Sequence, residues 1–133
     1  MTLKRQMKKI LLLCLSLTFL SANSQILINE YSAANYDTYS DNSGEYEDWL
    51  ELYNPTSNPI DLNGWYLTDK PTNPTKWMFP SSFIIPANDF AIVYCSGRDE
   101  IIGGEAHSNF KITQTKGNEV LMLSGPGNSF QDS

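Results

Sequence analysis

The sequence predicts an all-β domain of the sandwich type, with an open barrel as the second choice. Three observations carry this prediction. Helical periodicity is hard to find after residue 25, and short apolar or alternating runs recur at roughly ten-residue spacing. Proline also interrupts nearly every window long enough for a helix, at positions 55, 59, 71, 74, 80, 86 and 126.

A secretory signal precedes the predicted domain. Four basic residues lie within residues 4–9, and residues 10–20 form an apolar run typical of a signal-peptide core. Small residues then mark a cleavage site between Ser24 and Gln25. We therefore expect residues 1–24 to be a signal-peptide helix that is removed on export, to the extracellular space, the cell surface or the periplasm. The mature chain would keep no membrane span, and a buried N-terminal helix is the alternative.

The domain, residues 25–133, opens with predicted strands over residues 26–31 and 49–53. In the second strand Leu50 and Leu52 share one face, which favours a core position for both. Turn signals such as Asn63-Gly64 separate the strands that follow. These further strands are predicted over residues 60–62, 65–68, 76–79, 83–85, 90–95, 109–112, 120–124 and 129–132.

The predicted core is drawn from the apolar positions of these strands. Its named members are Leu50, Leu52, Trp65 and Ile92. Trp49, Trp65 and Trp77 lie next to aliphatic residues in strand patterns, so we expect packing rather than a sugar-stacking platform.

Length and charge limit the function classes. The chain has 133 residues, enough for one ordinary domain, with 9 basic and 15 acidic side chains. Removal of the leader leaves five basic and fifteen acidic residues, a net charge of −10. Such a surface repels phosphate backbones, so we expect no nucleic-acid partner, including lamin-like DNA binding. Cys95 is the only mature cysteine, which precludes an intramolecular disulfide and leaves pairing between chains open.

Several segments resemble the bacterial lamin-tail domain, and together they cover about residues 26–133. They are Ile28-Asn29-Glu30-Tyr31, residues 47–55, residues 60–67, residues 72–77 with Phe79-Pro80, Ile85-Pro86-Ala87, residues 96–99 and residues 107–111. The resemblance implies an immunoglobulin-like β-sandwich and a non-catalytic module of exported or surface proteins. In the family the last strand continues past a motif like Gln131-Asp132-Ser133, so we expect a C-terminally truncated fragment.

An acidic loop over residues 37–48 is a candidate calcium site. Hard cations take six to eight oxygen ligands, and a glycine-containing loop can wrap carboxylates around one ion. The EF-hand spacing fails at both ends of this loop, so the candidate site is irregular. Its predicted ligands are Asp37, Asp41, Glu45 and Asp48. A solvated acidic loop is the alternative, and no other cofactor is expected.

The same loop carries Tyr36, Tyr39 and Tyr46 among small polar residues. This composition is typical of adaptable binding loops, because a tyrosine ring offers contact area at a low entropy cost. We expect these three tyrosines to contact a partner, and we expect removal of Tyr39 to leave stability nearly unchanged. Tyr31 and Tyr53 lie in strand patterns and are expected to pack in or across the sheet.

Two functions from different classes follow. The first is a non-catalytic interaction or spacer module that binds a protein, a glycan or surface polymer, or neighbouring domains of its own protein. The second is an accessory domain of an exported hydrolase of the nuclease or phosphoesterase type, with catalysis encoded beyond Ser133. Cys95 and His107 are the one conceivable nucleophile and base, but such a cysteine at the end of an apolar strand is typically an inert core residue. We therefore expect no enzyme activity in this chain.

Overall fold

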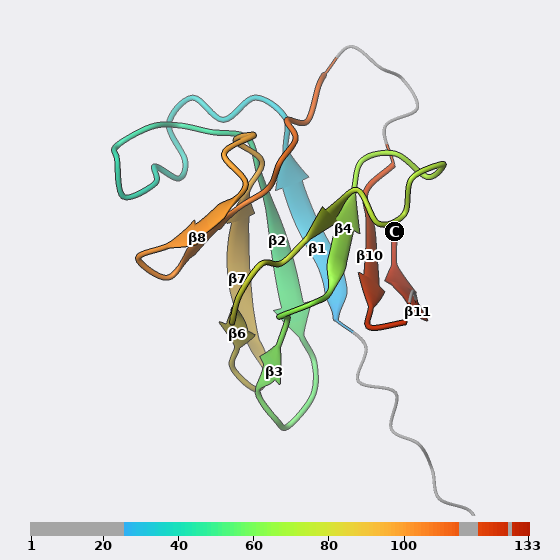
Figure 1. The fold of residues 1–133 in the computed structure, drawn as a ribbon. Helices are drawn as coiled ribbons and strands as arrows, with labels where there is room; N and C mark the ends of the chain where they lie inside the picture. The colour runs from blue at the N-terminus through green and yellow to red at the C-terminus, as the bar shows by residue number, and fades with distance from the viewer. Residues whose placement is uncertain (1–25, 115–119, 128) are drawn as a thin grey trace, which may run out of the picture.

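The structure is a computed structural model that describes residues 26–114, 120–127 and 129–133. These residues form eleven β-strands, and no helix occurs among them (Figure 1). The expected signal-peptide helix and the cleavage site between Ser24 and Gln25 lie outside the described residues.

The strands form two main sheets and one small one (Figure 1). The five-stranded sheet has the order β1 (Leu27–Ser32), β2 (Trp49–Asn54), β7 (Asp89–Tyr94), β9 (Glu105–His107), β8 (Glu100–Ile102). The four-stranded sheet has the order β11 (Ser129–Asp132), β10 (Met122–Gly125), β4 (Tyr66–Thr68), β5 (Trp77–Met78). The small sheet pairs β3 (Ile60–Asp61) with β6 (Ile84–Ile85). Only β7 and β9 pair in parallel among the described strands.

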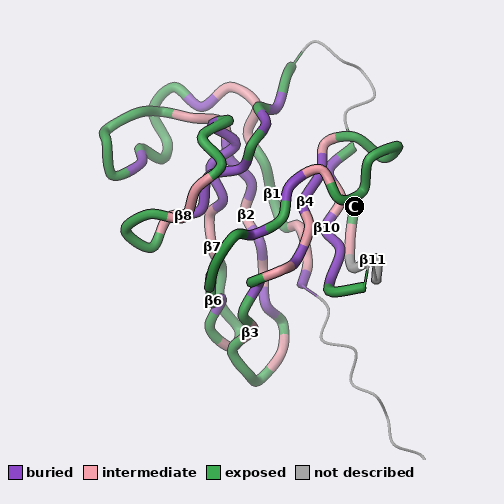
Figure 2. The backbone as a smooth tube through the Cα atoms, viewed as in Figure 1, coloured by how far each residue is buried: buried purple, intermediate pink, exposed green. Residues whose placement is uncertain are grey.

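The core lies between the two main sheets. On the five-stranded sheet the register places Leu50 opposite Val93, and both side chains are fully buried. On the other sheet Leu67 pairs with Leu123, and both belong to the same apolar cluster. Figure 2 shows the buried stretches concentrated on β2, β4, β7 and β10. The predicted sandwich is therefore confirmed, because alternate residues of both sheets meet in one core.

Three of the four predicted core residues are confirmed and one is wrong. Leu50, Leu52 and Trp65 are buried in the apolar cluster. Ile92 is only partly buried and pairs with Glu51 on the opposite face of the sheet. Its neighbour Val93 is the core residue, because successive side chains of a strand alternate between faces. The run over residues 90–95 is apolar throughout, so its pattern does not tell the faces apart.

The structure contains a hairpin that the sequence did not predict, and it lacks one predicted strand. Strands β8 and β9 pair across Gly103-Gly104, whose φ angles of 58° and 84° suit a tight two-residue turn. The predicted strand over residues 109–112 is wrong, because these residues form no ladder. Phe110 and Ile112 are nevertheless buried, since they anchor an irregular segment to the core.

The predicted tryptophan packing is confirmed. Trp49, Trp65 and Trp77 keep only 4%, 7% and 2% of their surface exposed. The Trp77 indole N–H donates a hydrogen bond to Asp99 at 2.8 Å. Trp49 lies outside the main core cluster, on the face of the five-stranded sheet turned away from the core. We call this the outer face.

Candidate functional site

A long loop, residues 33–48, packs on the outer face near one end of β2 and β7. Three side chains are neighbours there across β2, β7 and β9: Trp49, Tyr94 and His107. Tyr39 meets the Trp49 ring edge-on, with ring centroids 5.0 Å apart. The Tyr94 hydroxyl donates a hydrogen bond to the Ser40 carbonyl at 2.9 Å. Burial raises the pKa of Tyr94, and the nearby carboxylates raise it further by a smaller amount. The hydroxyl therefore stays protonated and holds the loop at neutral pH.

Asn35 holds the loop closed on itself. Its side chain is buried, and its Nδ2 donates to the carbonyls of Tyr39 and Glu47, the latter at 3.0 Å. Its Oδ1 accepts from the Thr38 N–H at 3.0 Å. One buried amide therefore joins the beginning of the loop to its end, which satisfies backbone groups that would otherwise cost free energy.

Asp41 fixes the middle of the loop to the connection between β7 and β8. Its Oδ1 accepts from the backbone N–H groups of Ser43 and Glu45 at 2.8 and 3.0 Å, and its Oδ2 pairs with Arg98. We call the Asp41–Arg98 pair the latch. Burial alone would raise the pKa of Asp41, but the two backbone donors and the guanidinium together outweigh burial and lower it. The carboxylate is therefore charged at neutral pH.

The four predicted calcium ligands are not gathered into one group. Among the described residues, no three His, Cys, Asp or Glu side chains come together as metal ligands could. Asp41 already uses both of its oxygens in the latch and in the backbone hydrogen bonds. Calcium binding through Asp37, Asp41, Glu45 and Asp48 stays a prediction, with a solvated acidic loop as its alternative.

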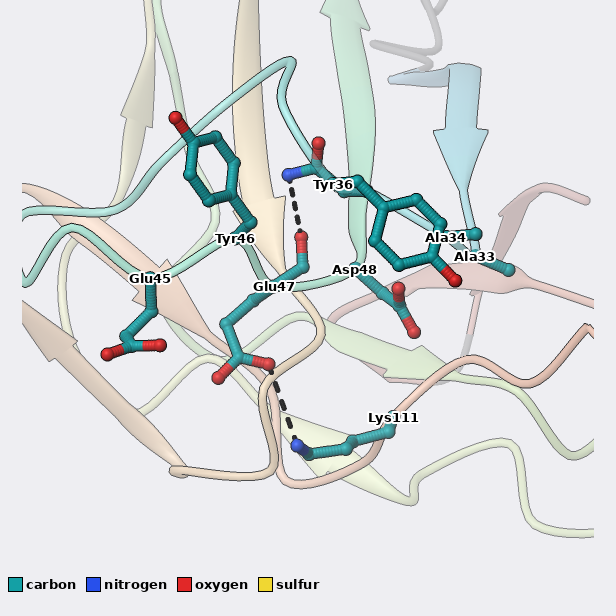
Figure 3. Close-up of a pocket in the computed structure, with 9 residues that line it drawn as sticks. Ala33, Ala34, Tyr36, Glu45, Tyr46, Glu47, Asp48 and Lys111 are labelled. Carbon is teal, nitrogen blue, oxygen red and sulfur yellow. Dashed lines mark hydrogen bonds and ion pairs between the residues drawn. The ribbon is translucent and has the colours of Figure 1, made fainter.

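An open cavity of about 490 Å³ lies beside the two ends of this loop, where the chain leaves β1 and enters β2 (Figure 3). We call it the tyrosine pocket. Its lining residues come from both loop ends and from one residue after β9: Ala33, Ala34, Asn35, Tyr36, Glu45, Tyr46, Glu47, Asp48 and Lys111.

Two of the three predicted partner-binding tyrosines line this pocket. Tyr36 and Tyr46 keep 82% and 50% of their surface exposed. Tyr39 is 40% exposed, does not line the pocket, and instead contacts Trp49. Of the strand tyrosines, Tyr53 stacks on Phe90 across the sheet at 4.5 Å, whereas Tyr31 is more than half exposed.

The pocket is acidic. Glu45, Glu47 and Asp48 contribute three carboxyl groups, and Lys111 contributes the one cationic group of the lining. The Lys111 ammonium lies 3.6 Å from the Glu47 carboxylate, with 64% of the lysine side chain exposed (Figure 3). An exposed pair of this kind is weak, so the site keeps a surplus of negative charge at neutral pH.

Cys95 and His107 face opposite sides of the five-stranded sheet. Cys95 is fully buried in the core, whereas His107 stacks on Tyr94 at the outer face. The His107 Nδ1 lies 3.1 Å from the Ser96 hydroxyl, and its Nε2 lies 3.6 Å from Glu105. Neither His107 nor Ser96 lines the tyrosine pocket, and both are buried. The sheet therefore separates the one nucleophile–base pair that the sequence offered.

Sequence reasoning missed Arg98, Lys111 and Asn35. The sequence offered a weak signal for Arg98, because residues 25–133 contain only five basic residues to pair with fifteen acidic ones. No sequence signal pointed to Lys111. It lies more than sixty positions from Glu47, its ion-pair partner, and the apolar spacing around it predicts a strand. Asn35 looked like any other polar loop residue.

Two antiparallel-rich sheets packed around one core, with a pocket carried by a loop outside it, define an immunoglobulin-like β-sandwich module. The model of the Lamin Tail Domain family matches residues 20–132, and the chain belongs to this family. The family resemblance found in the sequence is therefore confirmed, and the family is one of non-catalytic immunoglobulin-like domains. A search of curated proteins gives no match to this chain.

Proposed function

We propose that this chain is a non-catalytic interaction module of an exported protein, and that it binds a partner protein or surface polymer through the tyrosine pocket. One observation carries the proposal: two exposed tyrosine rings line a cavity on a loop that internal hydrogen bonds hold in place. A preorganised loop loses little conformational entropy on binding, which favours affinity.

Export is the second part of the proposal, and it is supported by the leader features within residues 1–24. Among the described residues no helix has the length and apolar character to cross a bilayer. N-terminal sequencing of the protein recovered outside the cytoplasm tests export, and we expect the mature chain to begin at Gln25.

The binding role is tested with two ligand collections and one variant. Residues 25–133 are panned against displayed random peptides and in parallel against a glycan array. We expect retained ligands in one collection, and we expect the double variant Tyr36→Ala/Tyr46→Ala to lose them. Tyr31→Ala is the matched control, because Tyr31 is comparably exposed but lies on β1, outside the pocket lining. Ligands that survive the double variant, or that depend equally on Tyr31, contradict the proposal.

A further inference from the structure

We infer that the tyrosine pocket binds a lysine or arginine side chain from a basic segment of a partner protein. This inference rests on the binding role proposed above and names the chemistry of the ligand. The volume, about 490 Å³, exceeds what one side chain fills, so flanking backbone of the segment would also enter.

The first argument is charge. Three carboxyl groups and one ammonium line the pocket, and no basic residue occurs in the chain between Gln25 and Asp69. An acidic concavity on an acidic surface raises the local concentration of cations and repels phosphate or carboxylate ligands. The complementary partner is therefore basic.

The second argument is the aromatic lining. A ring face attracts a cation through its quadrupole, and guanidinium groups also stack on it. In Figure 3 the Tyr36 and Tyr46 rings lie on opposite sides of Glu47, whose carboxylate reaches toward Lys111. All of these residues line the pocket, as does Asp48. Aromatic faces together with carboxylates therefore suit a cationic group, and the carboxylates repel anions.

The third argument is that the protein already places one cation there. The Lys111 ammonium reaches the rim and lies 3.6 Å from Glu47, so the pocket accepts this chemistry within its own fold. With 64% of its side chain exposed, Lys111 is loosely held and competes only weakly with an incoming cation.

The probe is a short peptide of glycine and serine that carries paired arginines, with a twin in which citrulline replaces arginine. Citrulline keeps the shape and removes the charge. Both are titrated into ¹⁵N-labelled residues 25–133 while backbone amide shifts are followed. We expect the arginine peptide to change the amide chemical shifts of residues 33–36 and 45–48 until binding saturates. We expect the citrulline peptide to leave these chemical shifts unchanged.

Paired variants separate this site from general attraction to an acidic protein. Glu45→Gln should weaken binding of the arginine peptide about threefold, whereas Glu30→Gln, which removes the same charge on β1, should not. Lys111→Met should strengthen binding about threefold, because it removes the internal competitor and keeps the aliphatic stem. Lys70→Met is its control, since Lys70 is exposed and does not line the pocket.

Equal effects within either pair overturn the inference, because they indicate attraction by net charge alone. Failure of the arginine peptide to bind, or equal binding of the citrulline peptide, also overturns it. If peptides selected by display still depend on Tyr36 and Tyr46, the proposed binding role stands and only the ligand chemistry is wrong. If that dependence is absent too, both proposals fail.

Discussion

At the scale of single residues, the two faces of the five-stranded sheet should differ sharply in their response to truncation. Leu50→Ala removes a fully buried side chain from the core and should lower the free energy of unfolding by about 2–5 kcal/mol. Ile92→Ala truncates a partly buried side chain on the outer face and should cost about 1 kcal/mol or less. Urea unfolding of both variants measures the difference. A larger loss for Ile92→Ala would mean that the register is shifted by one residue.

The Tyr39 ring should contribute to stability, contrary to what its place in a polar loop suggested. Tyr39→Ala removes the edge-on contact with Trp49 and exposes that ring, so we expect a loss of about 1 kcal/mol. Tyr36→Ala is the matched control, because 82% of Tyr36 is exposed and its loss should leave the melting temperature unchanged. Thermal melts followed by tryptophan fluorescence report both variants. Equal melting temperatures for the two would show that the Trp49 contact does not form in solution.

These residues also show how far the sequence predicts side-chain roles. Strand β2 alternates apolar and polar residues, so Leu50 and Leu52 were assigned to the core correctly. Strand β7 is apolar on both faces, because loop 33–48 covers part of its outer face, and Ile92 was therefore misassigned. Tyr36 and Tyr46 were predicted from loop composition, but the contact between Tyr39 and Trp49 depends on how the loop folds back.

At the scale of elements, the latch should make loop 33–48 sensitive to acid. The pKa of Asp41 is lowered in the folded state, so its charged form is favoured by folding. This contribution to stability is present above the unfolded-state pKa of an aspartate and is lost as the pH falls through the lower folded-state value. Asp41→Asn removes the charge and should cost roughly 2 kcal/mol at neutral pH.

The test compares urea unfolding of wild type and Asp41→Asn over a series of pH values. The two stabilities should converge as acid protonates Asp41. The quantity to compare is the difference in unfolding free energy between the two proteins at each pH. Asp61 also adds an acid-dependent contribution in both proteins, because the Asn63 backbone N–H and other donors lower its pKa. A stability difference that stays constant down to strong acid would show that the charge of Asp41 does not hold the loop.

Elements were predicted best where a turn signal separated two strands. Asn63-Gly64 and the turn before β7 fell where expected, and Gly64 has the positive φ of 79° that this turn requires. Gly103-Gly104 is an equally strong signal, yet its flanking strands have only three residues each and escaped notice. The apolar residues Phe110 and Ile112 imitate a strand because anchoring a loop to the core produces the same spacing.

At the scale of the whole molecule, both edges of the five-stranded sheet are protected from further pairing. Edge strand β1 shifts register between Ile28 and Glu30, and it brings Glu30 opposite Glu51. The other edge, β8, has only three residues. Bulges, edge charges and short strands all discourage addition of another chain. Binding through a loop pocket is consistent with such a module, since both edges of the five-stranded sheet are unsuited to partners.

A thermal melt of residues 25–133 in calcium and in chelator tests whether the acidic loop is a cation site or a self-sufficient element. We expect one cooperative transition in both buffers, because a single core joins the two main sheets. We also expect no calcium-dependent rise. Arg98 and two backbone N–H groups already occupy three of the roughly four acceptor sites of the Asp41 carboxylate.

Binding to the folded state at about 100 times the dissociation constant would add roughly 2.7 kcal/mol, a rise of roughly 10 °C for a domain of this size. Sodium chloride at the same ionic strength is the control, because screening alone relieves repulsion within residues 25–133, whose net charge is −10. A rise of that size in calcium but not in sodium would support Asp37, Asp41, Glu45 and Asp48 as ligands. The tyrosine pocket would then be organised by an ion, and a basic side chain would compete with calcium for Glu45 and Asp48.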